Sequence, residues 1–155
     1  MQAKPGVIDA LNTMLMLELT AVNRYFLQAE MMANWGYERL HAKIRALSLS
    51  EMEDAEALIK HILYLEGIPN VQRLNQVQIG ETPVENLTLD VAEEKLVVST
   101  LAELIAHCAS VQDFTTRGML EAMIKEEEEH VDWFETQLET IRQIGAENYL
   151  TEQLH

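Results

Sequence analysis

Residues 126–133 read Glu126-Glu127-Glu128-Glu129-His130-Val131-Asp132-Trp133. Glu127 and His130 are three positions apart, so on an α-helix both side chains project from the same face. Apolar Met123 and Phe134 continue that face on either side. The segment therefore predicts a helix whose inward stripe is apolar except for one carboxylate and one imidazole near its middle.

Three other helical stripes are interrupted in the same way. Glu51-x-x-Asp54 lies on one of them, and the single glutamates Glu18 and Glu94 lie on the other two. An error of one position in the register would leave any one of these acids on a solvated face. Four interruptions, each flanked by apolar residues in phase, are better explained by burial. The flanking residues are Leu11, Leu15 and Val22; Ile44, Leu47 and Leu58; Leu87, Val91, Val98 and Leu101; Leu120, Met123 and Phe134.

The composition favours an all-α domain. The 155 residues are 48% apolar but only 6% aromatic, with 6 Gly and 3 Pro, which favours helix over sheet. We expect one domain, residues 1–155, because a chain of this length has room for a single substantial core. The expected helices are 5–34, 38–66, 83–112, 114–144 and 147–153.

The segment 67–82 predicts how the helices are connected. It is weakly periodic and contains Gly67, Pro69 and Gly80. Extended, it reaches about 50 Å, which exceeds the roughly 40 Å length of a helix of nearly 30 residues. We interpret it as a crossover that makes the second and third helices parallel. A four-helix bundle with one long crossover and a short fifth helix is the ferritin-like architecture.

The charge of the chain limits its partners. A formal net charge of -15 repels nucleic acid and anionic membrane surfaces and attracts cations. No apolar run of 18 residues is present, so we expect no membrane span. Asp9 and Asn12 interrupt the first apolar residues, so no signal peptide is expected. The single Cys108 excludes an internal disulfide and is typical of the reducing cytoplasm, where we expect the protein to be located.

A pair of metal ions accounts for the buried acids. Five carboxylates in one core would repel one another and take up protons, whereas two divalent ions would offset most of their charge. Carboxylate oxygens combined with imidazole suit iron or manganese, and they also bind zinc. Di-iron carboxylate bundles use a Glu from each of two helices and Glu-x-x-His from each of the other two. Five of six positions agree here, and the candidate ligands are Glu18, Glu51, Asp54, Glu94, Glu127 and His130.

Other polar residues near these stripes have simpler interpretations. Tyr25 lies two turns from Glu18 and either donates a hydrogen bond to a ligand carboxylate or packs in the core. In the run 126–129, only Glu127 is expected to face the core, and the other acids form a solvated face. His61 lies one helical repeat from Asp54, too far away to act as a ligand.

The chain resembles bacterioferritins over nearly its whole length. The resemblance rests on Leu17-Glu18-Leu19-Thr20-Ala21, Tyr25-Phe26, Asn34-Trp35-Gly36, Leu63-Tyr64-Leu65-Glu66-Gly67-Ile68-Pro69-Asn70, the segment 126–133 and Asn148-Tyr149-Leu150. It implies a cage of 24 subunits in which iron is oxidised at a di-iron site within each subunit and stored as ferric mineral. It also implies haem b between two subunits, with Met52 of each as an axial ligand, and a ferredoxin-like electron donor for iron release.

Position 54 departs from the family, which normally has histidine there. Asp54 either still reaches a metal or turns away, in which case only one iron is held well. Five carboxylates around two ferrous ions leave one excess negative charge, which predicts a preference for the ferric state and slower release. Ala46 and Ser50 occupy positions where relatives carry His and Asp as an inner-surface relay for iron, so we expect that relay to be absent.

Two functions remain open after this comparison. The first is an iron-storage cage subunit whose ferroxidase activity is impaired by Asp54. The second is a haem-contributing, ferroxidase-deficient subunit of a mixed cage, dependent on a second bacterioferritin subunit with an intact site. A DNA-protecting mini-ferritin is disfavoured because its site lies between subunits. A rubrerythrin-like peroxidase is excluded because it needs a C-x-x-C module and this chain has one Cys.

Overall fold

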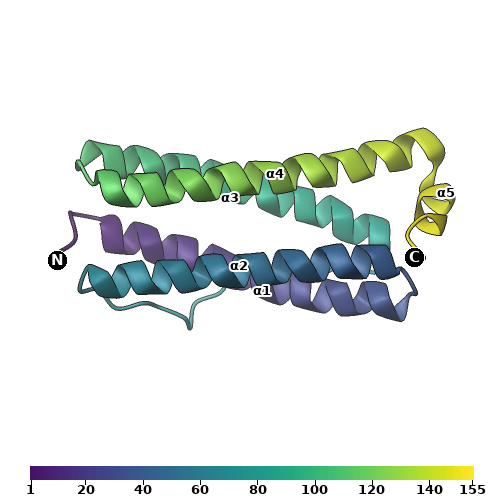
Figure 1. Ribbon diagram of the computed structural model, residues 1–155, viewed down its shortest axis with the longest axis horizontal. Helices are drawn as coiled ribbons and strands as arrows, with labels where there is room; N and C mark the ends of the chain where they lie inside the picture. The colour runs from purple at the N-terminus through teal and green to yellow at the C-terminus, as the bar shows by residue number, and fades with distance from the viewer.

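The computed structural model describes all 155 residues, and its regular structure is entirely helical. The helices are α1 (Val7–Asn34), α2 (Glu38–Tyr64), α3 (Pro83–Ser110), α4 (Phe114–Ile144) and α5 (Ala146–Thr151). The four long helices lie side by side, and α5 folds back across the end of the bundle near the C-terminus (Figure 1). The predicted ferritin-like four-helix bundle with a short fifth helix is confirmed. No helix combines the length and the apolar character that crossing a membrane requires.

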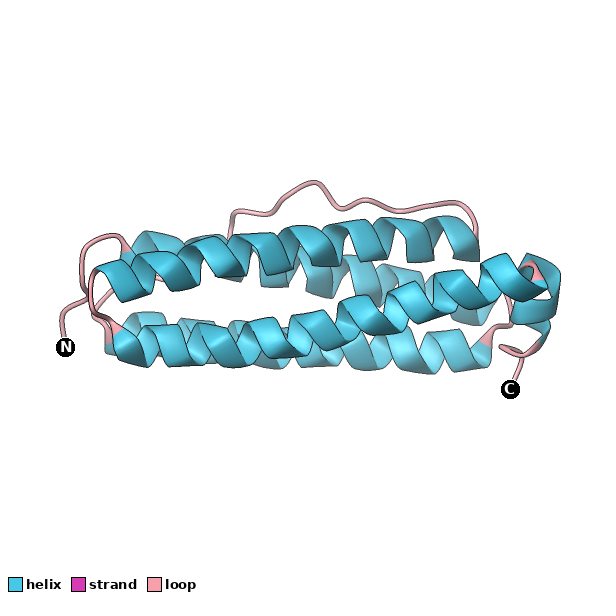
Figure 2. Ribbon diagram, turned by 90° about the horizontal axis from the view of Figure 1, so that it is seen from above, coloured by secondary structure: helices cyan, strands magenta, loops and turns pink.

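The bundle consists of two antiparallel helical hairpins, one formed by α1 with α2 and the other by α3 with α4. The connection between them runs along the outside of the bundle from the end of α2 to the start of α3 (Figure 2). Side chains of α1 hold this crossover in place. Asn12 donates from Nδ2 to the Ile68 carbonyl at 3.1 Å and accepts from the Asn70 amide at 2.8 Å. The Thr20 hydroxyl accepts from the Asn75 amide at 3.0 Å.

Four helix ends differ from the predicted ones by two residues: the start of α1 and the ends of α2, α3 and α5. Gly6 has φ 77°, so α1 begins at Val7 rather than at Pro5. The turn after α2 is made by Glu66, with φ 62°, and not by Gly67. The Gly67 amide then donates to the Ile62 carbonyl at 2.9 Å, which closes a Schellman motif. Gln112, with φ 61°, ends α3 in the same way. A left-handed residue other than Gly or Asn at these positions leaves no signal in the sequence.

The hydrophobic core is divided into two clusters. One is built from the first half of α1, the second halves of α2 and α3, and the start of α4, and it includes Leu11, Leu58, Leu101 and Leu120. The other includes Tyr25, Ile44, Leu87 and Phe134. On every long helix the predicted acids lie between the residues of the two clusters. The two apolar clusters therefore enclose a polar layer at mid-height of the bundle.

A buried ion pair lies beside this layer. The side chain of Arg24 is 2% exposed and that of Asp90 is fully buried, with 3.3 Å between Arg24 Nε and Asp90 Oδ1. Burial raises the pKa of Asp90 to about 7, although the guanidinium opposes this shift. No local pattern in the sequence predicts this pair, which joins α1 to α3.

Removing one partner of this pair should be costly because the other charge stays buried. We expect Asp90→Ala to lower the free energy of unfolding by about 3–5 kcal/mol at pH 8, where Asp90 is ionised. Replacing both partners, with Arg24→Met and Asp90→Leu together, should recover most of this loss. Urea denaturation of the metal-free protein followed by circular dichroism measures both effects. A double variant less stable than Asp90→Ala would contradict the role of the ion pair.

Candidate di-metal centre

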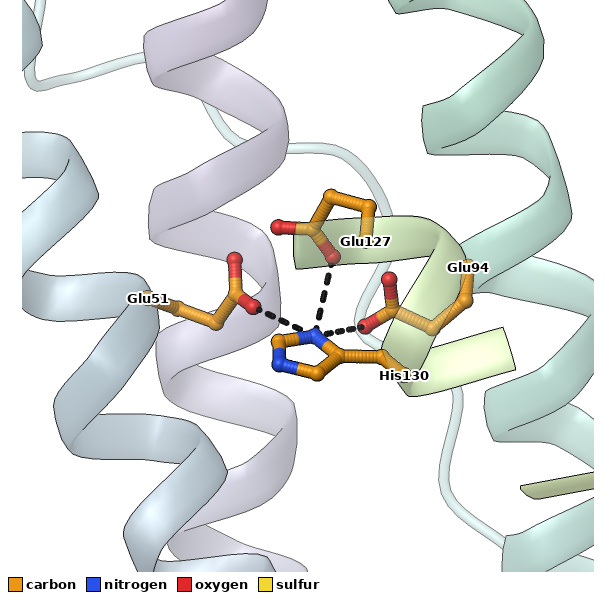
Figure 3. A group of neighbouring side chains, drawn as sticks. All are labelled: Glu51, Glu94, Glu127 and His130. Carbon is orange, nitrogen blue, oxygen red and sulfur yellow. Dashed lines mark hydrogen bonds and ion pairs between the residues drawn. The ribbon is translucent and has the colours of Figure 1, made fainter. Parts of the chain in front are cut away.

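The four long helices each place a glutamate in the polar layer. Glu18 of α1, Glu51 of α2, Glu94 of α3 and Glu127 of α4 are each at most 1% exposed. Figure 3 shows three of these carboxylates pointing toward the imidazole of His130. His130 Nδ1 lies 3.1 Å from Glu127 Oε2, 3.2 Å from Glu51 Oε1 and 4.0 Å from Glu94 Oε1. Side chains from three helices therefore converge on one nitrogen atom.

The six predicted ligands form two overlapping groups, in each of which the ligand atoms lie within 4.8 Å of one another. One group is Glu51, Glu94, Glu127 and His130; the other is Glu18, Glu51, Asp54 and Glu127. Ligand atoms bound to one ion at about 2.0–2.2 Å are separated by less than twice that distance. Small side-chain shifts would therefore let each group close on one ion, with Glu51 and Glu127 shared between the two.

One oxygen of each of the five carboxylates is buried and has no hydrogen-bond partner. These atoms are Glu18 Oε2, Glu51 Oε1, Asp54 Oδ2, Glu94 Oε2 and Glu127 Oε1. Buried polar atoms in folded proteins are almost always bonded, so a group of unbonded ones requires an explanation. Oxygen atoms aimed at a common centre, with one imidazole nitrogen, form a suitable donor set for iron, manganese or zinc.

Tyr25 supports this layer from the side. Its hydroxyl donates a hydrogen bond to Glu94 Oε1, and its ring stacks on Phe134 with 6.1 Å between the centroids. Burial raises the pKa of Tyr25 well above its usual value, which keeps the phenol protonated as a donor. Arg24 covers the ring, with Cζ 4.7 Å from its centroid. The two interpretations left open for Tyr25, hydrogen bonding and core packing, are both realised.

Comparison with known proteins places this arrangement in a family. A family model described as a ferritin-like domain matches residues 8–144. The bacterioferritin of Mycobacterium leprae is 43% identical over 149 residues, which cover 96% of this chain and 94% of that protein. The bacterioferritin BfrA of Mycobacterium tuberculosis is 44% identical with the same coverage. The bacterioferritin of Brucella melitensis is 37% identical, covering 96% of this chain and 92% of that protein.

The chain belongs to the bacterioferritin family. The predicted resemblance to bacterioferritins is therefore confirmed.

Asp54 points into the centre of this bacterioferritin. One of its carboxylate oxygens belongs to the group with Glu18, Glu51 and Glu127. Unlike the other five candidate ligands, Asp54 is only half-buried. Burial, followed by repulsion from Glu126 and Glu51, raises its pKa to about 8. Asp54 therefore lies at the edge of the centre, between the buried ligands and a further carboxylate.

That further carboxylate corrects an expectation from the sequence. Glu126 was assigned to a solvated face, but it is half-buried and its Oε1 accepts a hydrogen bond from the Ser50 hydroxyl. Its negative charge lies close enough to Asp54 to raise the pKa of that carboxyl. Glu126 lies one residue from the inward stripe, so α2 covers it although helical periodicity predicts exposure. Glu128 and Glu129 are exposed, as predicted.

Protons stabilise the buried acids when no metal is bound. Burial raises the pKa of Glu18 and of Glu94 well above the usual value, and repulsion from Glu51 adds to the shift at Glu18. Burial also raises the pKa of Glu127 to about 7. Burial lowers the pKa of His130, but its contacts with Glu127 and Glu51 outweigh this and raise it to about 11. A metal ion that binds here must therefore displace protons.

Met52 lies outside the di-metal centre, on the outer surface of α2. Its side chain is 51% exposed, and Leu49, one turn earlier on the same face, is 45% exposed. On the neighbouring helix α1, Phe26 is 63% exposed. The outer face of α2 thus presents an exposed thioether beside the apolar side chain of Leu49.

The raised pKa values predict that the metal-free protein loses stability as the pH rises from 5 to 8. Between these values the folded acids retain protons that the unfolded chain, with carboxyl pKa values near 4, has released. Each extra proton held by the folded state contributes a slope of about 1.4 kcal/mol per pH unit. His130, with its raised pKa, acts in the same direction above about pH 6.5.

Differential scanning calorimetry of the metal-free protein across this pH range measures the slope. The variant Glu18→Gln should reduce it, whereas Glu30→Gln, at an exposed position on the same helix, should leave it unchanged. Saturation with a divalent metal should abolish it. A midpoint temperature that rises from pH 5 to pH 8 without metal would contradict the expectation.

Proposed function

We propose that this chain stores iron as a subunit of a cage. We also propose that it oxidises ferrous iron at the centre formed by Glu18, Glu51, Asp54, Glu94, Glu127 and His130. The observation that supports this most directly is the set of four buried glutamates and the half-buried Asp54, each with one unbonded oxygen, around a single imidazole. Membership of the bacterioferritin family supports iron storage and assembly into an oligomer. We further propose that the cage contains 24 subunits.

In this proposal the ferrous ions are the substrate and the protein residues bring two of them together. Glu51 and Glu127 belong to both ligand groups, so they can hold the two ions side by side. The carboxylates favour ferric over ferrous iron because they stabilise the higher charge more strongly. Dioxygen accepts the electrons that the ions lose. The Tyr25 hydroxyl fixes the orientation of Glu94 through its hydrogen bond, so this ligand does not have to be ordered when the metal arrives.

Asp54 sets the charge balance of the proposed centre. Five carboxylates and a neutral imidazole around two ferrous ions leave one negative charge in excess. That charge stabilises the oxidised product and therefore slows its release to the mineral. We infer that oxidation in this subunit is followed by slow clearance of the centre, so that repeated turnover is impaired while the first turnover occurs.

The exposed thioether of Met52 supports a second element of the proposal. Together with the Met52 side chain of a second copy, it would hold a haem b group between two subunits, with Leu49 as an apolar neighbour. When bound, haem supplies a one-electron carrier for the reduction of stored ferric iron by a ferredoxin-like donor. A subunit that retains Met52 but carries Asp54 also fits a mixed cage, in which a second subunit type with an intact site performs most of the oxidation.

Anaerobic ferrous titration followed by addition of oxygen tests the proposed centre. We expect two ferrous ions to bind per chain and to be oxidised in a first turnover. In later turnovers Asp54→His should be several-fold faster than the parent chain, because it removes the excess charge. Glu128→Gln, at an exposed position of α4, should behave like the parent. Less than one ferrous ion bound per chain would refute the centre, and equal later rates would show that Asp54 does not limit turnover.

The haem proposal is tested by the absorption spectrum of the purified cage. Met52→Leu should abolish the Soret band and leave the ferrous titration unchanged, because Met52 lies outside the centre. Met31→Leu, which changes a partly buried methionine of α1, should retain the band. Persistence of a full Soret band in Met52→Leu would contradict the assignment. Co-purification of a second bacterioferritin subunit from the native cell would favour the mixed cage over a cage of one subunit type.

A further inference from the structure

The two groups of candidate ligands differ in their donor atoms. The group that contains Glu94 and His130 offers carboxylate oxygens and an imidazole nitrogen. The group that contains Glu18 and Asp54 offers carboxylate oxygens only. The shared residues, Glu51 and Glu127, contribute equally to both, so the difference is due to the unshared pair in each group.

The all-oxygen group is a built position rather than a cluster of surface acids. Glu18 is 1% exposed, and its Oε2 is buried without any hydrogen-bond partner. Glu51 is equally buried, and Asp54 contributes a buried Oδ2 that also has no hydrogen-bond partner. Unbonded carboxylate oxygens at this depth require a cation or a proton. In this position Glu18 and Glu51 are therefore buried in the core, and Asp54 is half-buried on the side nearer the solvent.

The chemistry of the two donor sets predicts different metal preferences. Oxygen-only sites suit hard cations such as Mn²⁺, Mg²⁺ and Fe³⁺, whereas imidazole strengthens the binding of Fe²⁺ and especially Zn²⁺. For a given site, affinity still increases from Mn²⁺ to Zn²⁺. The advantage of Zn²⁺ shrinks where nitrogen donors are absent, so Mn²⁺ competes best at the position that contains Asp54.

We propose that the centre has two unlike metal positions, of which the one formed by Glu18, Glu51, Asp54 and Glu127 is selective for hard cations and accepts Mn²⁺ in competition with Zn²⁺. The position with His130 retains the ordinary preference for Zn²⁺ and Fe²⁺. This inference rests on the proposed function to the extent that the cluster must hold two metal ions. It goes further by assigning a class of ion to each position.

Metal competition, without any measurement of oxidation, tests the proposal. The metal-free oligomer is equilibrated anaerobically with equal concentrations of Mn²⁺ and Zn²⁺, separated from free ions, and analysed by elemental mass spectrometry. Electron paramagnetic resonance then reports the bound Mn²⁺. We expect the ratio of Mn²⁺ to Zn²⁺ to fall by about tenfold in Asp54→His, because both positions then contain an imidazole.

A swapped variant is the matched control. Combining Asp54→His with His130→Asp exchanges the unlike ligands between the two positions and keeps the composition of the centre constant. It should restore the ratio of the parent chain, whereas a variant that is merely damaged would bind less of both ions. Total binding below one ion per chain in the parent would refute the proposed centre itself. Two ions per chain with the same ratio in the parent and in Asp54→His would overturn only the inequality of the positions.

Discussion

Mutual repulsion among four buried glutamates and the half-buried Asp54 is the constraint on which the rest of the structure depends. The acids cannot separate, because apolar clusters on both sides of the polar layer fix the four helices that carry them. Without a cation, the folded chain retains protons on Glu18 and Glu94 and an imidazolium at His130, as their raised pKa values indicate. The two apolar clusters therefore keep together a layer of acids whose own charges repel one another.

A second polar layer keeps the first in position. Tyr25 joins Glu94 to the buried pair of Arg24 and Asp90. Further toward the start of α3, Asn86 accepts a hydrogen bond at Oδ1 from the Gly80 amide at 2.7 Å. A side chain at position 80 would clash with Glu85, whose Cβ would lie 2.6 Å from the added atom. The end of the crossover is thus fixed against the same helix that supplies Glu94.

Periodicity predicts the fold well because it reports which face of a helix is buried. The interrupted stripes predict the four long helices. The length of the segment 67–82 predicts that α2 and α3 run parallel to each other. Periodicity is less informative about residues just beside a stripe. It predicts that Glu126 is exposed to solvent, whereas α2 partly covers this side chain. The pairing of Arg24 with Asp90 joins residues far apart in the sequence, so no local pattern reveals it. One signal was available, since Asp90 lies one turn before Glu94 on the same face of its helix.

The division of the bundle into two hairpins gives the metal centre a mechanical role. The hairpin of α1 and α2 carries Glu18, Glu51 and Asp54, and that of α3 and α4 carries Glu94, Glu127 and His130. Neither half contains a complete ligand group, because both groups draw on residues from each hairpin. A cation held by either group would therefore connect the two hairpins, and its affinity would add to their cohesion. Such a connection would act at mid-height of the bundle, between the two apolar clusters, where the core itself contributes least.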